Sequence, residues 1–178
     1  MIIFFVRHAS AGRKLLNAKK DERRPLDDDG ILQARYAGRM LANLDAQVEH
    51  VISSPLTRAL QTASLVANEL AFEGAIERDD ALRPESEFAQ FQALVAKYRR
   101  SEAIMVVGHN PSLTEFLSKT ISQNSSVAAA HLEFKKGGVA RVEVNGRNGI
   151  LQWLVTPKLA RTLQPSLKAS SRPKTSRK

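Results

Sequence analysis

Two short apolar runs in this chain are each followed at once by a histidine. Residues 2–6 are apolar throughout and precede Arg7 and His8, and residues 104–108 form a similar run before His109. Continuous runs of this length, rich in β-branched and aromatic residues, are typical of strands buried on both faces of a parallel sheet. Open parallel sheets bind ligands beyond the carboxyl ends of their strands. The pattern therefore predicts that both histidines meet at one edge of a sheet.

A third short strand is predicted at residues 50–53, and the chain after it supplies Arg58. Ser54 is a favoured N-cap residue and Pro55 suits the first helical position, so we expect a helix from here to about residue 71. Arg58 would then lie in the first helical turn, where the helix dipole disfavours a cation unless an anion compensates. The placement indicates an anion-binding site beside the histidines.

Strand signals alternate with amphipathic segments along the rest of the chain. We expect helices over residues 28–44 and 86–99, and one after His109 that Asn110 caps. Two late strands, 139–144 and 150–155, flank a turn rich in asparagine and glycine, which predicts a hairpin. The alternation predicts a three-layer α/β/α fold, with a mostly parallel central sheet and an antiparallel hairpin at one edge.

The segment 28–44 carries a clear helical signal. Its three leading acids, residues 27–29, favour the positive end of a helix dipole, and Asp27 or Asp28 is the expected N-cap. The helical period predicts one apolar stripe along it, made of Ile31, Ala34, Leu41 and Leu44.

Length and charge limit the classes of function. At 178 residues without cysteine, the chain is expected to form one domain that uses neither disulfides nor thiolate metal ligands. Of the 27 basic residues behind the net charge of +9, seven lie in residues 158–178, which hold no acid; the rest of the chain has 20 basic and 18 acidic residues. We therefore expect a domain over residues 1–157 and a basic, flexible tail over residues 158–178.

The sequence argues against two classes of partner. The tail has no aromatic residue interleaved with its basic residues for base stacking, which argues against nucleic acid. The apolar runs are strand-sized and shorter than a membrane span. We expect a cytoplasmic monomer.

Histidines and arginines gathered at one sheet edge suit phosphoryl transfer. A phosphoryl group presents several negative oxygens, and fixed positive charge around them promotes its transfer. The planar fork of arginine donates hydrogen bonds in pairs, so Arg7 and Arg58 are fitting ligands. His8 can act as a nucleophile if one ring nitrogen is unprotonated and the other is held by an acceptor.

A metal site is the alternative for paired histidines. The sequence contains no short-spaced cluster of metal ligands, and neighbouring arginines would repel a cation. No phosphate-binding glycine loop of the nucleotide type is present, so we expect no cofactor. The two other histidines, His50 and His131, are not accompanied by arginines at a predicted strand end. We interpret them as structural or surface residues.

Four separated motifs agree with one known family. They are Arg7-His8-Ala9, Arg24-Pro25-Leu26 followed by Gly30, Ser53-Ser54-Pro55 with Arg58-Ala59 and Gln61-Thr62, and Gly108-His109-Asn110-Pro111. In this order, over about residues 1–157, the chain resembles the histidine phosphatase superfamily, also called phosphoglycerate-mutase-like. Within it, the short length and the arginine before Pro-Leu are most similar to the SixA-type phosphohistidine phosphatases.

The resemblance implies a role for each matching residue. His8 would take the phosphoryl group, while Arg7, Arg58 and His109 hold its oxygens. Arg24 would add a contact to substrate, and Asn110, which follows His109, is a further substrate-binding candidate. Water would then hydrolyse the phosphohistidine, with no metal required.

Two departures from the family pattern bear on substrate. Ala9 stands where the family usually has glycine, a small change that removes no reacting group. Pro84 stands near the position where mutases and ester-cleaving members often place a glutamate that protonates the leaving oxygen. Glu85 and Glu87 lie close by in sequence as candidate general acids, or as surface residues in the first turn of the next helix.

Three functions therefore remain open from the sequence. The first is a phosphatase that removes phosphate from phosphohistidine on a protein partner, whose leaving nitrogen needs little help from an acid. The second is a phosphomonoesterase of the same family that acts on a small phosphorylated molecule. The third is a module that binds phosphate or another polyanion without turnover.

Overall fold

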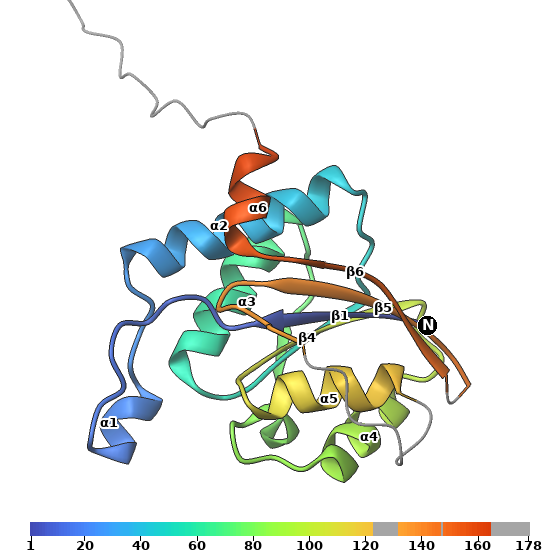
Figure 1. Cartoon of the computed structure of the whole chain (residues 1–178), viewed down its shortest axis with the longest axis horizontal. Coiled ribbons are helices and arrows are strands. Elements are labelled where there is room, and N and C mark those ends of the chain that lie inside the picture. Colours follow the sequence, from blue (N-terminus) through green and yellow to red (C-terminus); the bar gives the residue numbers. More distant parts are fainter. Residues whose placement is uncertain (123–131, 147, 165–178) are drawn as a thin grey trace, which may run out of the picture.

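A six-stranded sheet runs through the middle of the computed structural model, which describes residues 1–122, 132–146 and 148–164 (Figure 1). The strands lie in the order β3-β2-β4-β1-β5-β6. The first four are mutually parallel, whereas β5 is antiparallel to both β1 and β6. This confirms the predicted mostly parallel sheet with an antiparallel hairpin at one edge. The strand bounds are β1 (Ile2–Arg7), β2 (His50–Ser53), β3 (Ile76–Arg78), β4 (Ala103–Gly108), β5 (Val139–Asn145) and β6 (Asn148–Val155).

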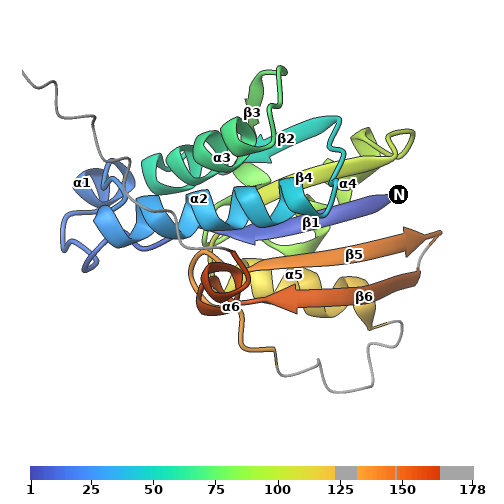
Figure 2. The ribbon, with the colours of Figure 1, turned by 90° about the horizontal axis from the view of Figure 1, so that it is seen from above.

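Helices cover both faces of the sheet and complete three layers (Figure 2). One face carries α2 (Asp28–Asn43), α3 (Thr57–Glu69) and α6 (Pro157–Thr162), and the other carries α4 (Phe88–Lys97) and α5 (Ser112–Ile121). A short helix, α1 (Ala18–Glu22), stands at the end of the molecule, and a 3₁₀ turn, η1 (Asp80–Leu82), precedes α4. Over the described residues, none of these helices combines the length and apolarity that a membrane crossing requires.

The side chains of β1 alternate between two hydrophobic cores. Phe4 and Val6 belong to the core under α2 and α3, and Ile3 and Phe5 to the core under α4 and α5. On the second side, the ring of Phe5 lies 5.5 Å from that of Phe91. Because successive residues of a strand point to opposite faces, a sheet covered on both faces needs an apolar residue at every position. This explains why residues 2–6 of β1 are all apolar.

The start of α2 is held to the loop after β1. Asp27 is its N-cap, as predicted, and its Oδ1 accepts a hydrogen bond from the Gly30 N–H at 2.7 Å. The other oxygen of Asp27 accepts from the Ser10 hydroxyl at 2.7 Å. A Cβ on Gly30 would lie 1.9 Å from the Ser10 carbonyl oxygen, so only glycine permits this approach.

The apolar stripe predicted along α2 is partly wrong. Ala34 and Leu41 are buried, but Ile31 is 39 % exposed and Leu44 is 55 % exposed. The buried face is built mainly from small residues, and a Cβ on Gly38 would lie 2.7 Å from Cβ of Glu69 in α3. The buried face of α2, which packs closely on α3, therefore includes Leu41 but neither Ile31 nor Leu44.

Two predicted N-caps are also wrong. Helix α3 begins at Thr57 after Leu56, so Ser54 does not cap it, and α5 begins at Ser112, so Asn110 does not cap that helix. Both side chains make other hydrogen bonds at the edge of the sheet, described below. Tertiary partners replaced the local capping bonds that these residue types favour.

The C-terminal boundary differs from the one expected at residue 157. Helix α6 begins at Pro157, with Thr156 as its N-cap, and buries Ala160. The side-chain amide of Gln164 donates to the Tyr36 carbonyl of α2 at 2.5 Å. Packed structure therefore continues to residue 164, and the predicted tail from residue 165 onward lies outside the described residues.

Candidate active site

The carboxyl ends of β1, β2 and β4 lie side by side. Arg7 of β1 pairs with Gly108 of β4, and Ser53 of β2 pairs with Val107 of β4. The residue that follows each strand is therefore delivered to the same edge of the sheet. These residues are His8, Ser54 and His109.

His8 is buried beside His109, with 4.9 Å between their ring centroids. Its Nδ1 lies 2.8 Å from the Ala9 carbonyl oxygen. Because a carbonyl only accepts hydrogen bonds, Nδ1 carries the proton and Nε2 keeps its lone pair. Burial lowers the pKa of His8 to about 3, against the opposing effect of the Ala9 carbonyl, and Arg58 and Arg7 lower it further. The imidazole is therefore neutral at neutral pH.

His109 is buried in a different hydrogen-bonding environment. Its Nε2 lies 2.9 Å from the Ser54 hydroxyl oxygen, and that oxygen accepts from the Leu56 N–H at 3.4 Å. We assign the hydroxyl hydrogen to the contact with Nε2, which places the proton of His109 on Nδ1. That Nδ1 is buried and has no partner in the described part of the chain. Burial, followed by the charges of His8 and Arg58, lowers the pKa of His109 to about 2.

Arg7 is held by backbone from the segment before β5. One of its terminal nitrogens donates to the Phe134 carbonyl at 2.6 Å, and the side-chain amide of Asn110 donates to the same oxygen at 3.2 Å. The N–H of Gly137, at a φ of +69°, lies 3.1 Å from the carbonyl oxygens of both Arg7 and His8. The amide of Asn110, a predicted substrate ligand, is thus engaged in holding the backbone that orients Arg7.

Asp21 joins the two remaining arginines. Its backbone carbonyl accepts from Arg58 at 2.9 Å, and its Oδ2 lies 3.3 Å from the same guanidinium nitrogen. Its Oδ1 accepts from Arg24 Nε at 2.9 Å and from the Leu15 N–H at 2.8 Å. Burial raises the pKa of Asp21, but these donors and the charge of Arg58 outweigh it and lower the pKa to about 2. Asp21 is therefore a permanent anion that fixes both guanidiniums.

Sequence reasoning missed Asp21. The available signal was its spacing of three residues from Arg24, although Arg24 lies beyond the end of α1 and the pair is not a helical one. No pattern in the sequence indicates the contact of Asp21 with Arg58, which lies 37 residues further along the chain.

Other motif residues connect the loops that carry the arginines and His8. The Thr62 hydroxyl donates to the Arg58 carbonyl at 2.7 Å and accepts from the Ala9 N–H at 3.1 Å. The side-chain oxygen of Gln61 accepts from the Leu26 N–H at 2.8 Å. Helix α3 thereby holds the loop after β1 and the start of the Pro-Leu segment in fixed positions.

The candidate general acids lie just before α4. The Glu85 side chain is 70 % exposed and 3.9 Å from an Arg83 nitrogen. The Glu87 backbone N–H donates to Gln90 Oε1 at 2.8 Å, at the start of α4. Both line a groove of about 600 Å³ between α4 and α5. Neither His8 nor His109 lines that groove, and among the described contacts no hydrogen bond or ion pair joins either acid to these histidines.

Of the remaining histidines, His50 alone lies in the described part of the chain. His50 lies on β2, with its Nδ1 3.0 Å from Glu77 and its ring 4.8 Å from that of Tyr98. His131 lies outside the described residues. In residues 1–122, 132–146 and 148–164, no three acidic or histidine side chains gather to hold a metal ion.

Comparison with known proteins gives a consistent result. Residues 3–94 match the family model of the histidine phosphatase superfamily (branch 1). The phosphohistidine phosphatase SixA of Escherichia coli strain K12 is 27 % identical over 162 residues, which are 88 % of this chain and 94 % of that protein. A structure of the protein histidine phosphatase SixA complexed with tungstate covers 89 % of this chain and 98 % of its own, with a TM-score of 0.77 and 24 % identity. The alpha-ribazole phosphatase from Shigella flexneri covers 88 % and 97 %, with a TM-score of 0.69 and 18 % identity.

Proposed function

The chain belongs to the histidine phosphatase superfamily and is a phosphatase, and from this premise we propose that it removes phosphate from phosphohistidine on a protein partner through a phosphorylated His8. The observation that carries the proposal is the state of the His8 ring. Its Nδ1 donates to a carbonyl, so the neutral ring presents an unprotonated Nε2 beside Arg7, Arg58 and His109. A fixed lone pair next to fixed donors is the requirement for attack on a phosphoryl group.

The first step of the proposed reaction transfers the phosphoryl group to the enzyme. Nε2 of His8 forms a bond to phosphorus as the bond from phosphorus to the substrate nitrogen breaks. Arg7, Arg58 and the Nδ1–H of His109 hold the non-bridging oxygens, where negative charge is spread. The leaving imidazole keeps the electron pair of the broken bond and takes a proton from solvent.

The second step restores the enzyme. Water attacks the phosphorus of phosphorylated His8, the bond to Nε2 breaks, and phosphate leaves with the oxygen of the water. The Ala9 carbonyl holds Nδ1–H throughout, so Nε2 returns to its unprotonated state. The reaction as proposed uses residues of this chain without a metal ion.

The absence of a neighbouring acid among the described contacts favours a nitrogen leaving group. Asp21 is the buried carboxylate at this edge, and with its pKa lowered to about 2 it holds no proton at neutral pH. An alkoxide leaving group needs a proton from a general acid, whereas the weaker bond of a phosphoramidate breaks without one. These properties support phosphohistidine over a phosphate ester.

A phosphomonoesterase acting on small molecules is the second candidate. The groove with Glu85 and Glu87 also contains Pro111 and Ser112, which follow His109 in the chain. A substrate that reached from the histidines into this groove would meet a carboxyl group. The third alternative, polyanion binding by the tail, concerns residues outside the described part of the chain.

The test is a substrate panel on the full chain combined with trapping of the phosphoenzyme. We expect an acid-labile phosphoenzyme, and faster turnover of a phosphohistidine peptide and of phosphoramidate than of sugar, nucleotide or aryl phosphates. A preference for esters that Glu85→Gln abolishes would favour the second candidate. Failure to trap any phosphoenzyme would exclude His8 as the nucleophile.

A further inference from the structure

A basic arm projects from the end of the molecule where the strands carry their catalytic residues. We define the arm as residues 13–20, the end of the loop after β1 and the first turn of α1. Figure 2 shows α1 beyond the carboxyl end of β1, outside the three layers. Every residue of the arm is exposed, although the chain on both sides of it returns to the protein.

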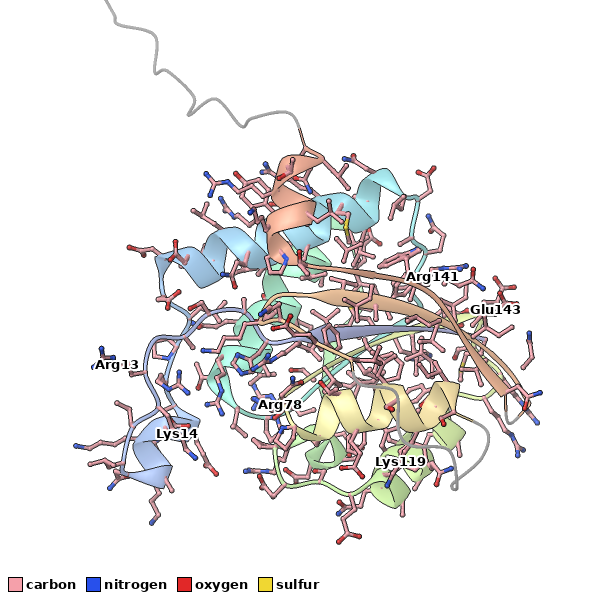
Figure 3. All side chains as sticks on the ribbon, in the orientation of Figure 1. Arg13, Lys14, Arg78, Lys119, Arg141 and Glu143 are labelled. Atoms are coloured by element: carbon pink, nitrogen blue, oxygen red, sulfur yellow. The ribbon has the colours of Figure 1, made fainter. Side chains whose placement is uncertain are left out.

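The arm combines exposed leucines with basic side chains. It contains two adjacent leucines, and Leu16 is fully exposed while Leu15 is 43 % exposed. Its four charged side chains are all basic, whereas the domain as a whole is nearly balanced. Figure 3 shows two of them, Arg13 and Lys14, at the outer edge of the molecule. The basic residues of the arm are Arg13, Lys14, Lys19 and Lys20.

The base of the arm is fixed directly to the candidate active site. Arg24 donates to the carbonyl oxygens of Ala11 and Gly12 and to Asp21, which closes the two ends of the loop on each other. Asp21 in turn contacts Arg58. The arm therefore stands at a set position beside the phosphoryl-binding residues, although its own side chains contact solvent.

We propose that the arm docks the protein substrate, by binding an acidic surface with an apolar patch next to the phosphohistidine. The proposal rests on the function proposed above and specifies its substrate class. Four cations without an acid are complementary to a negative surface, and adjacent exposed leucines favour burial against a partner. A small phosphorylated molecule has no acidic protein surface with an apolar patch for the arm to bind.

The chemistry of the arm favours a protein over the other anionic partners. It has no tryptophan, tyrosine or phenylalanine, the residues that stack on bases in single-stranded nucleic acid. Tryptophan and tyrosine also anchor proteins at the interface of a lipid bilayer. An acidic protein surface needs only the cations and leucines that the arm has.

The test compares two phosphohistidine peptides and one small substrate. One peptide places glutamate and leucine around the phosphohistidine, the matched peptide places lysine and glycine there, and phosphoramidate reports the chemistry without docking. The arm variants are the double substitution Lys14→Glu with Lys19→Glu and the single substitution Leu16→Ser. The matched control is Arg99→Glu with Arg100→Glu, an equal charge change on exposed residues before β4, at the amino end of that strand.

We expect the charge reversal in the arm to lower kcat/KM on the acidic peptide by about tenfold or more, because close charge pairs at an interface become repulsive. Leu16→Ser should lower it less, and turnover of phosphoramidate should change by less than about twofold in all variants. The control should leave the preference for the acidic peptide intact. Raising the salt concentration should reduce this preference in the unmodified protein.

Two outcomes would overturn the docking role alone. One is equal kcat/KM on both peptides in the unmodified protein, and the other is arm-dependent binding to phosphatidylserine vesicles or single-stranded RNA without any effect on peptide turnover. If the unmodified protein neither turned over phosphoramidate nor formed a phosphoenzyme, the proposed function itself would be refuted. The two failures are therefore distinguishable.

Discussion

The segments after β1 and β4 begin alike and then differ in one hydrogen bond. Each brings a buried histidine to the same edge of the sheet, and burial lowers both pKa values, to about 3 for His8 and about 2 for His109. The His8 ring faces the Ala9 carbonyl through Nδ1, whereas the His109 ring faces the Ser54 hydroxyl through Nε2.

This difference distinguishes two roles for one residue type. A carbonyl acceptor leaves His8 with a lone pair on the opposite nitrogen, which suits a nucleophile. A hydroxyl that donates to His109 leaves the opposite nitrogen with a proton, which suits a hydrogen-bond donor to a phosphoryl oxygen. The environment of each ring, more than its pKa, therefore supports the proposed assignment.

Replacing each histidine in turn by alanine should give the largest effects among these tests. We expect His8→Ala to lower kcat by about 10⁴-fold or more and to abolish the phosphoenzyme, because the nucleophile is lost. His109→Ala should lower kcat by about 10²- to 10³-fold, because one donor is lost, and should still form a phosphoenzyme. Rapid-quench phosphoenzyme measurements separate the two. A phosphoenzyme retained in His8→Ala would reverse the assignment.

Replacing Arg58 tests a positive charge that lowers the pKa of both His8 and His109. We expect Arg58→Ala to lower kcat/KM by about a hundredfold or more, by analogy with loss of one preorganised donor. Asp21→Asn should have a smaller effect that falls on kcat more than on substrate binding, because the guanidinium remains but is held less firmly. Steady-state kinetics on phosphoramidate measures both. A near-normal rate for Arg58→Ala would contradict its assigned role.

Ser54→Ala tests the hydrogen bond that distinguishes His109 from His8. We expect it to lower kcat by about tenfold, because the ring is no longer held in the tautomer with a proton on Nδ1. Ser53→Ala is a matched control, since the neighbouring Ser53 hydroxyl is also buried but donates to the Ser54 carbonyl at 2.9 Å. Equal effects of the two substitutions would mean that loss of packing explains the result.

The shared burial of the rings predicts a smaller, acid-dependent loss of stability. Both folded-state pKa values lie below the unfolded value near 6.5. Below pH 6.5 the unfolded chain binds protons that the folded protein does not, so stability falls as pH is lowered from about 6.5 toward 3. Each histidine contributes a slope of up to about 1.4 kcal/mol per pH unit. Urea unfolding of His8→Asn and of His109→Gln between pH 7 and pH 5 should each show a shallower slope than the unmodified protein.

The predictions from sequence succeeded where a local pattern had one solution. The apolar runs before His8 and His109 predicted parallel strands, and Asp27 predicted the start of α2. They failed where a residue type favours one local bond but a distant partner offers another. Ser54 and Asn110 are good N-cap residues, yet the structure uses their side chains for His109 and for the Phe134 carbonyl.

The residues that each strand delivers follow from the local pattern, because a strand buried on both faces must be apolar and the polar residue after it marks the edge of the sheet. The partners of each delivered side chain arise only when distant segments pack together. Ser54 and His109 are separated by 55 residues, and Asp21 and Arg58 by 37. The proton position on His109 and the orientation of Arg58 depend on these contacts, and no local period in the chain encodes contacts between segments so far apart. The proton position on His8, by contrast, depends on the carbonyl of the adjacent Ala9.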